Sequence, residues 1–504
     1  MKKRLIYTCV TTLAIILASC QKLVTVNPQN ALTPAQTLVD VNGYLTLLTG
    51  AYANLEGYGY WGRDLIIEGD ALADNIVTNN SLAGGRYTNA NLNSAGATFN
   101  FWTASYFYIN QLNTIIAGIN TLTNLTPAQT ALQAQILAQA YAVRGVYYFD
   151  LARVYGWEPN NVPTTGPDAG FTFSAVLRLT PINTPDGAAP KINRSTIAQT
   201  YAQIISDFSK AISLFQAIGN SKIDKPFAFS ESSAHGFLAK VYLYAQDYPN
   251  CVTQCQAALN PTICPAVLTP AGTYSKAFKS SPNPESLMEL NYNQSIQVVG
   301  VTGSNGSPYT YTQPTNYGFV GVGLPGAPNG VATFGGQTIS AELLAAFDSP
   351  TDDRLAMFYT SRTSSTAATF TWCNKYSGAG GLYTDNIPML RYSDVLLMQA
   401  EALAAQGQYA PAQALVVQLR AARNAITTTV PADITLKQFI QDERRRELFF
   451  EGNRFFDLKR LGLGVTKAAL TSVGTISAND YRLIAPLPGT EVLFNPALPQ
   501  NPNY

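Results

Sequence analysis

The chain has 504 residues and a formal net charge of +1, and 12% of its residues are charged while 46% are hydrophobic. A chain of this length can bury a large core, and its near-neutral charge gives no general attraction to nucleic acid. Six cysteines and one histidine do not supply a convincing zinc spacing. We therefore expect no metal, no cofactor and no nucleic-acid partner.

The first residues predict a cleaved signal peptide. Three basic residues at positions 2 to 4 precede an apolar run, residues 5–18, that is too short to span a bilayer. The run ends Leu-Ala-Ser-Cys20, which looks like a bacterial lipobox. We expect residues 1–19 to be removed, Cys20 to be lipidated, and residues 20–37 to tether the mature chain to a membrane. Ordinary cleavage near a chance cysteine is the alternative.

Helical periodicity marks much of the chain from residue 38 onward. The expected helices cover residues 38–55, 101–119, 134–155, 196–215, 233–245, 249–259, 393–403 and a segment that reaches 423. Thr196 and Gln199 form a capping box at the start of one of them. Arg144 lies on an apolar helix face and therefore needs a buried partner. The pattern predicts a mostly α, compact single domain, residues 38–504, with degenerate tetratricopeptide-type helix pairs and long irregular ligand-binding loops.

Four cysteines lie in the expected domain, at positions 251, 255, 264 and 373. Burial as small side chains that pack a helix pair is the preferred interpretation. A disulfide between Cys255 and Cys264 remains open, because a secreted chain folds in an oxidising compartment.

A loop-rich insert, about residues 261–340, contains the first candidate for a ligand site. Between Glu289 and Glu342 the chain carries no charged residue, and it is rich in glycine, asparagine and tyrosine. Aromatic faces with neutral amides suit a neutral, hydroxyl-rich or peptide ligand, and they suit phosphate poorly. A second glycine- and asparagine-rich stretch covers residues 79–100. We expect the two stretches, 291–340 and 79–100, to form one ligand surface, although irregular surface covering is the alternative for each.

Eight residues are the candidates for ligand contact. Two of them, Trp61 and Trp372, are expected to face solvent, whereas Trp102 and Trp157 are expected to pack in the core. The full set is Trp61, Arg86, Tyr87, Asn91, Tyr309, Tyr311, Tyr317 and Trp372.

The segment 437–460 is the most charged part of the chain, and it alternates charge with an apolar helical stripe. Glu443 and Glu447 fall on or beside that stripe, where a carboxylate is costly unless it is paired. The nearby arginines at positions 444, 445, 446 and 454 are expected to supply the partners. The predicted structural ion-pair residues are Arg144, Glu443, Arg444, Glu447, Glu451 and Arg454.

The same segment resembles the C-terminal signature of the SusD/RagB family, roughly E-R-x-x-E-L-x-x-E-G-x-R-x-x-D-L-x-R. It matches here from Glu443-Arg444 through Glu447-Leu448 and Glu451-Gly452 to Asp457-Leu458 and Arg460. A second family block is similar to residues 142–156. Further blocks fall at Glu285, Asp352-Asp-Arg354, Lys375 and Leu390-Arg-Tyr-Ser-Asp394.

The resemblance implies a SusD-like fold and a nutrient-binding lipoprotein of the outer membrane that faces the cell surface. Such a protein would bind an oligosaccharide or peptide and pass it to a SusC-like TonB-dependent transporter, without enzymatic activity. Two other functions are weighed against it. Glu443 and Glu447, four residues apart, could be the carboxyl pair of a secreted glycoside hydrolase or other hydrolase, but surrounding arginines oppose the raised pKa that a general acid needs. The neutral loops could also bind only protein, as part of a structural scaffold.

Overall fold

The computed structural model describes residues 34–78, 87–96, 98–182, 191–219, 225–292, 337–362, 369–376, 385–467 and 473–504. Helices dominate these residues and the strands are short, which confirms the prediction of a mostly α fold. Within the same ranges, no helix combines the length and the apolarity needed to cross a bilayer.

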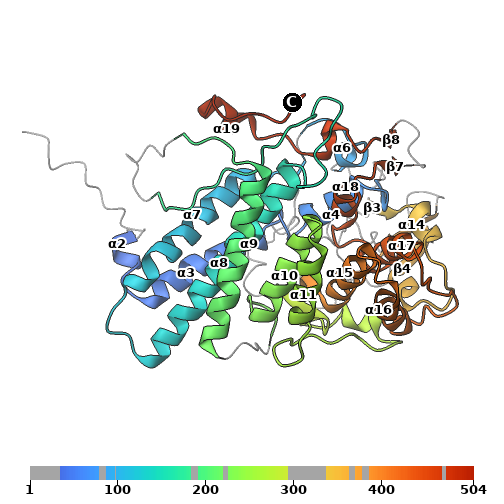
Figure 1. Cartoon of the computed structure of the whole chain (residues 1–504), viewed down its shortest axis with the longest axis horizontal. Helices are drawn as coiled ribbons and strands as arrows, with labels where there is room; N and C mark the ends of the chain where they lie inside the picture. The colour runs from blue at the N-terminus through green and yellow to red at the C-terminus, as the bar shows by residue number, and fades with distance from the viewer. Residues whose placement is uncertain are drawn as a thin grey trace, which may run out of the picture.

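Four long helices make up one half of the molecule, on the left of Figure 1. They are α3 (Val41–Leu55), α7 (Trp102–Gly118), α8 (Pro127–Tyr155) and α9 (Ile197–Ile218). α8 begins earlier than the expected residue 134, because Thr126 and Gln129 form a capping box with Pro127 at the first helical position. The capping box predicted at Thr196 is confirmed.

Arg144 on α8 reaches across to α9. Its guanidinium lies 2.6 Å from Asp207, and both side chains are buried. This ion pair satisfies a charge that would otherwise be costly on the apolar face of α8. Because α8 and α9 pack along their length, the pair also ties together the two longest helices.

The second half contains shorter helices. Two of them, α10 (Glu231–Tyr244) and α11 (Tyr248–Ala258), lie near the centre of the molecule, next to the long helices (Figure 1). The others are α15 (Tyr392–Ala405), α16 (Tyr409–Ala421), α17 (Leu436–Leu448) and α18 (Arg454–Arg460). α10 packs on α11, α15 packs on α16, and α11 joins the two pairs through α15. All four cysteines at positions 251 to 373 are buried and free, so the Cys255–Cys264 disulfide is not formed.

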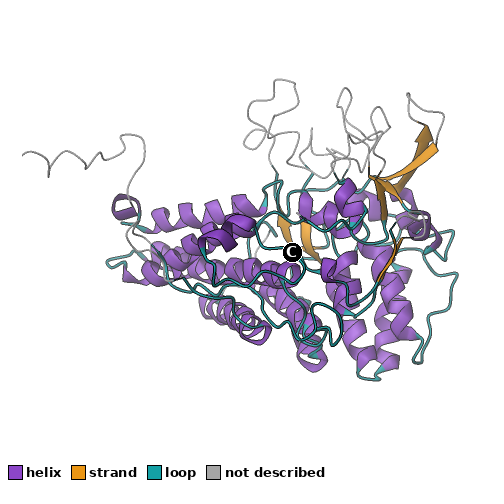
Figure 2. Ribbon diagram, turned by 90° about the horizontal axis from the view of Figure 1, so that it is seen from above, coloured by secondary structure: helices purple, strands orange, loops and turns teal. Residues whose placement is uncertain are grey.

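The strands form four antiparallel pairs among the described residues. They are β1 (Ile76–Thr78) with β3 (Gln337–Ile339), β2 (Ser286–Leu290) with β6 (Ile387–Arg391), β4 (Phe358–Arg362) with β5 (Thr369–Cys373), and β7 (Val465–Lys467) with β8 (Gly474–Ile476). Figure 2 shows the strands set among the helices and toward one side of the molecule. The short α-helices of the described residues are α2 (Pro34–Thr37), α4 (Asp64–Ala71), α6 (Thr88–Asn91), α12 (Tyr274–Ala277), α14 (Ala341–Ala345) and α19 (Gly489–Phe494).

Candidate ligand surface

One strand pair joins the bases of the two predicted ligand loops. β1 ends at Thr78, where the 79–100 stretch begins, and β3 begins at Gln337, near the end of the charge-free run. The strands are antiparallel, with Thr78 opposite Gln337. The Thr338 hydroxyl also donates to the Val77 carbonyl at 2.8 Å, between residues 261 positions apart in sequence. The fold therefore brings the two stretches to a common base.

Tyr292 fixes the other end of the charge-free run. Its backbone amide donates to Asn386 Oδ1 at 3.0 Å, and its hydroxyl donates to the Glu56 carbonyl at 2.7 Å. Gly62 leaves room for this contact, because a Cβ there would lie 2.8 Å from the Tyr292 hydroxyl and 2.1 Å from the Glu56 carbonyl oxygen. The turn formed by residues 56–64 is therefore shaped to hold Tyr292.

The same turn holds Tyr87. The Tyr87 hydroxyl donates to Asp64 Oδ1 at 2.7 Å, and Arg63 Nε donates to the same oxygen at 2.6 Å. Burial and the Asp64 carboxylate raise the pKa of Tyr87, so its phenol remains a donor at neutral pH. We call the turn 56–64 together with Thr78, Tyr87, Tyr292 and Gln337 the loop base.

The two tryptophans expected at the surface are buried. Trp61 is 5% exposed, and its indole N–H donates to Asp150 Oδ2 at 2.8 Å. Trp372 is 0% exposed and packs edge to face against Phe370 on β5. The expectation that they face solvent is wrong, because Asp150 on α8 gives Trp61 a buried hydrogen-bond partner, and Trp372 is covered in the β4–β5 pair, where it lies opposite Tyr359.

The other candidate contact residues divide into two groups. Tyr87 and Asn91 are each 3% exposed, so their side chains lie in the interior and not at the surface. Ligand contact by these residues, and by the two tryptophans, stays a prediction. The remaining candidates, Arg86, Tyr309, Tyr311 and Tyr317, lie outside the described residues, as does Cys20.

Glu447 on α17 is the centre of a buried ion-pair network in the second half of the molecule, the half that contains α15 to α18. Its carboxylate lies 3.1 Å from Arg354, 2.9 Å from Arg391 and 2.9 Å from Arg423. Burial by itself would raise the pKa of Glu447, but the guanidinium groups hold it well below its usual range. The Glu447 carboxylate is therefore ionised and fully paired.

Glu443, one helical turn earlier, has its own partners. It lies 2.7 Å from Arg354, 2.8 Å from Arg420 and 2.9 Å from Arg446. Against the rise that burial would cause, these arginines lower the pKa of Glu443 to about 2. Both carboxylates are thus poorly suited to act as a general acid.

The expected partners were mostly wrong. Of the four arginines close in sequence, only Arg446 pairs with Glu443 within the described residues, and none pairs with Glu447. Successive helical residues point about 100° apart, so Arg444 and Arg445 leave α17 in other directions. Arg444 pairs with Asp457 and Asp394, both at 3.1 Å. The predicted network residue Glu451 lies 2.7 Å from both Lys375 and Arg391.

Helices α17 and α18 also bind the segment that leads into β1. Arg454 on α18 lies 2.8 Å from Asp74, and Arg445 donates to the Asp74 carbonyl at 2.9 Å. The Ser340 hydroxyl, directly after β3, donates to that carbonyl as well, at 2.6 Å. Asp74 therefore connects α17 and α18 to the residues that immediately precede β1.

Periodicity did not identify the distant partners of Glu447, but a signal for two of the three was present in the sequence. Arg354 and Arg391 fall in the short family blocks outside the charged segment, whereas Arg423 falls in none of them. Glu285 and Lys375, which also lie in these blocks, pair with Arg391 and with Glu451. Tyr292 carried no comparable signal beyond its place at the start of the charge-free run. Among the described residues, no group of histidines, cysteines and carboxylates is arranged to hold a metal ion.

Comparison with known proteins places this fold in a family. Residues 25–243 match a family described as "Starch-binding associating with outer membrane", and residues 356–504 match the SusD family. The chain belongs to the SusD/RagB family. It is 25% identical to each of two SusD-like proteins of Formosa agariphila; one alignment covers 97% of this chain and 96% of the relative, and the other covers 95% of each.

Solved structures share the fold. A SusD superfamily protein from Bacteroides thetaiotaomicron aligns with a TM-score of 0.76 at 24% identity over 92% of this chain and 100% of its own. A SusD-like carbohydrate binding protein from Bacteroides vulgatus aligns with a TM-score of 0.71 at 20% identity, over 91% of this chain and 97% of its own. A laminarin binding SusD-like protein aligns with a TM-score of 0.67 at 22% identity, over 92% of this chain and 100% of its own.

Proposed function

We propose that this protein is a lipoprotein of the outer membrane, anchored through Cys20, that binds an oligosaccharide at the cell surface. It passes the ligand to a SusC-like TonB-dependent transporter. Family membership supports the general role, and the carbohydrate and laminarin binding of proteins with the same fold supports the ligand class. A peptide is the alternative ligand, because aromatic and neutral amide groups suit both.

The β1–β3 pair is the observation that carries the proposed site. It brings the 79–100 and 291–340 stretches to one base, and Tyr87 and Tyr292 are held by the same turn. A ligand that spans both stretches would meet tyrosine, asparagine and glycine and little charge. Neutral polar groups and ring faces recognise sugar hydroxyls and the apolar faces of pyranose rings.

The ionisation of Glu443 and Glu447 favours binding over hydrolysis. A retaining glycosidase needs one carboxyl group that is protonated near neutral pH. Arginines hold the pKa of both carboxylates low, and each carboxylate is buried against its partners. We therefore assign these residues to stability and the neutral loops to the ligand.

A panel of neutral glycans and peptides, followed by calorimetry with the best ligand, tests the assignment. Replacement of residues 303–317 by a short Gly/Ser linker should abolish binding, whereas Tyr311→Ala should weaken it severalfold, since one stacking contact contributes about 1 kcal/mol. Phe107→Ala removes an exposed aromatic on α7 and is the matched control. Wild-type affinity in the linker variant would show that the loop only covers the surface.

The transporter partnership needs a separate measurement. The linker variant should still co-purify with the SusC-like transporter, because docking is expected to use another face. Turnover of the bound glycan, lost on Glu447→Gln, would instead support the hydrolase. Binding of protein but of no glycan or peptide would support the scaffold.

A further inference from the structure

Two buried carboxyl groups beside the loop base differ from those of the ion-pair network. Glu289 lies on β2, shortly before Tyr292, and Asp70 lies in the last turn of α4, shortly before β1. Both residues are 0% exposed, as are Glu443 and Glu447. Glu443 and Glu447 accept from arginines, whereas within the described residues no cation lies in contact with Glu289 or Asp70. Any charge on these two carboxyl groups is therefore buried without a counter-charge.

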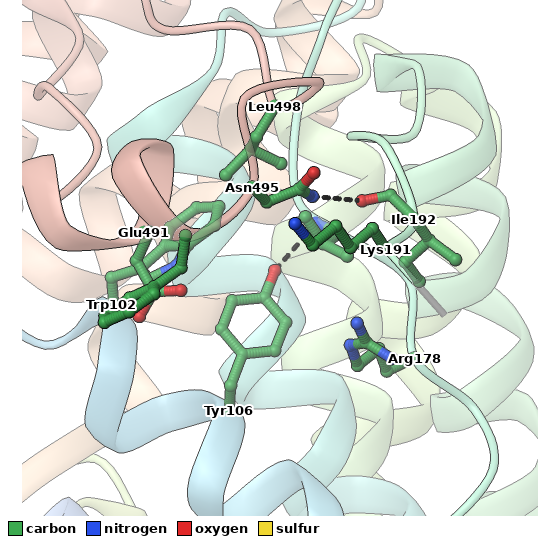
Figure 3. Close-up of a pocket in the computed structure, with 10 residues that line it drawn as sticks. Trp102, Tyr106, Arg178, Lys191, Ile192, Glu491, Asn495 and Leu498 are labelled. Atoms are coloured by element: carbon green, nitrogen blue, oxygen red, sulfur yellow. Dashed lines mark hydrogen bonds between the residues drawn. The ribbon is translucent and has the colours of Figure 1, made fainter. Parts of the chain in front are cut away.

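The pocket in Figure 3 shows the opposite situation. Lys191 there is exposed and Glu491 is half-buried, and the pocket opens to solvent, so water screens their charges. Among the described residues, none of those that define the loop base lines this pocket. Glu289 and Asp70 have no such contact with water, so burial acts directly on the ionisation of both groups.

Glu289 holds the start of the charge-free run through an asparagine. Its Oε1 accepts from Asn386 Nδ2 at 2.6 Å, and its Oε2 accepts from the Ser286 hydroxyl at 2.5 Å and from the Asn283 amide at 2.9 Å. Asn386 Oδ1 in turn accepts from the Tyr292 amide at 3.0 Å. Because the amino group of Asn386 has an acceptor on Glu289, its carbonyl oxygen is turned toward Tyr292.

Asp70 holds the end of the charge-free run in the same way. Its Oδ1 accepts from Asn75 Nδ2 at 2.5 Å, and its Oδ2 accepts from the Gly452 amide at 3.1 Å. The Asn75 carbonyl accepts from the Ser340 amide at 2.9 Å, directly after β3. Both ends of the run are therefore fixed by a buried carboxyl group that orients an asparagine.

Both carboxyl groups titrate near neutral pH. Burial raises the pKa of Glu289 to about 7, against the lowering by the hydrogen bonds from Ser286, Asn386 and Asn283. Burial likewise raises the pKa of Asp70 to about 7, against the lowering by the hydrogen bonds from Asn75 and Gly452. When Glu289 is protonated, Ser286 Oγ is close enough to accept from it.

No neighbouring charge replaces the missing counter-charge of Glu289. β6 and α10 pack against β2. Arg391 on β6 pairs with Glu285 at 2.8 Å, and Lys240 on α10 pairs with Asp394 at 2.9 Å. Neither contributes to the pKa of Glu289, and the same holds for the other titratable groups on the surrounding segments, Lys225, Glu231, His235 and Asp385.

The charges around Asp70 are also engaged elsewhere. Lys375 lowers the pKa of Asp70, but less than the hydrogen bonds do, and it pairs with Glu451 at 2.7 Å. The charged residues of α18, which packs on α4, form ion pairs with other residues. The other titratable groups nearby have their own hydrogen-bond acceptor or donor or a raised pKa; they are Glu68, Cys373, Tyr376 and Arg445.

The raised pKa values fix the direction of the pH effect. Exposed glutamate and aspartate have pKa values of about 4.3 and 3.9, so an opened loop base releases protons that the packed one still holds. The packed state is therefore favoured in acid. It loses this advantage as the pH rises from about 4 to about 7, and above pH 7 there is no further change from these groups.

We propose that Glu289 and Asp70 are pH-dependent anchors of the charge-free run: protonated, they hold both of its ends firmly, and ionised, they let these ends open more readily. That the run contacts a ligand rests on the proposed function, whereas the response of its two ends to pH does not.

Hydrogen–deuterium exchange of the full protein between about pH 5 and 8.5, corrected for intrinsic exchange rates, tests the proposal. The reporter peptides contain Tyr292, whose amide donates to Asn386, and Ser340, whose amide donates to Asn75. We expect the opening constant of both to rise by up to about tenfold per pH unit between about pH 5 and 7 and then to level off. Peptides from α8 should show no such rise.

Four variants assign the response to these residues. Glu289→Gln cannot titrate, so the rise at Tyr292 should disappear while the rise at Ser340 remains, and Asp70→Asn should do the reverse. Ser286→Ala removes a donor that favours the ionised form of Glu289, so levelling at Tyr292 should move up by about one pH unit. Asp433→Asn, at an exposed carboxyl group, is the control and should behave as the wild type does.

Two results would overturn the proposal. One is an opening constant at Tyr292 and Ser340 that does not change between about pH 5 and 7 in the wild type. The other is an unaltered pH profile at Tyr292 in both Glu289→Gln and Ser286→Ala. A protein that binds no glycan or peptide but keeps the pH response would contradict the proposed function alone, so the two failures give different results.

Discussion

Truncation of Glu447 is the sharpest test of how the second half of the fold is held together. Glu447→Ala removes a fully buried carboxylate that accepts from three guanidinium groups, those of Arg354, Arg391 and Arg423. Each arginine keeps another carboxylate, because Arg354 retains Asp352 and the other two retain Glu285. The space that the substitution leaves is nevertheless lined by three guanidinium groups that have lost their shared carboxylate.

Removal of one member of a buried ion pair costs about 3–5 kcal/mol. The entropy of unfolding is about 2.1 cal/mol/K per residue, which for 504 residues is about 1 kcal/mol per kelvin. The midpoint of thermal unfolding should therefore fall by about 3–5 °C. Glu447→Gln, which keeps the volume but loses the charge, should lie between the alanine variant and the wild type.

Scanning calorimetry of the wild type and both variants makes the measurement. Asp442→Ala on the same helix is the matched control. Within the described residues, the Asp442 side chain accepts one hydrogen bond, from exposed Gln438 at 3.1 Å, so its loss should shift the midpoint by less than about 0.5 °C. Ligand affinity at a temperature where all variants are folded should not change. A midpoint for Glu447→Ala equal to that of the Asp442→Ala control would refute the role of the network.

The other predictions concern the membrane anchor, the loop base and acid stability. Cys20→Ala should move the protein into the soluble fraction with its fold intact, and mass spectrometry of the native N-terminus that shows no lipid would contradict the anchor. Tyr87→Phe removes the hydroxyl that donates to Asp64, so it should lower stability by about 1.5–3 kcal/mol, measured by thermal melting; lost affinity without lost stability would instead make Tyr87 a ligand contact. Because the pKa of Glu443 falls from about 4.3 in the unfolded chain to about 2 in the folded one, its ionised form stabilises the fold above about pH 4.3. That contribution should disappear as the pH falls toward 2, so the difference in midpoint between wild type and Glu443→Gln should shrink over this range, and a constant difference would contradict the assignment.

Local sequence determined the helices and their capped starts. The Thr196–Gln199 capping box and the apolar repeat behind it depend on residues within a few turns of each other, so they can be read without knowledge of the rest of the fold. The charged signature from Glu443 to Arg460 likewise identified the family, because its spacing is fixed within one contiguous segment.

The tertiary structure alone decided which charges meet and which aromatic rings are buried. Glu447 binds Arg354, Arg391 and Arg423, which come from three other segments. Arg444 and Arg445 lie between Glu443 and Glu447 in sequence but pair with neither of them. Helical periodicity reports the face on which a side chain lies, but it does not report which distant element covers that face. For the same reason the sequence could not place Trp61 against Asp150, or Thr78 opposite Gln337. Those contacts exist only once the helices have packed and brought the ends of both loops to one base.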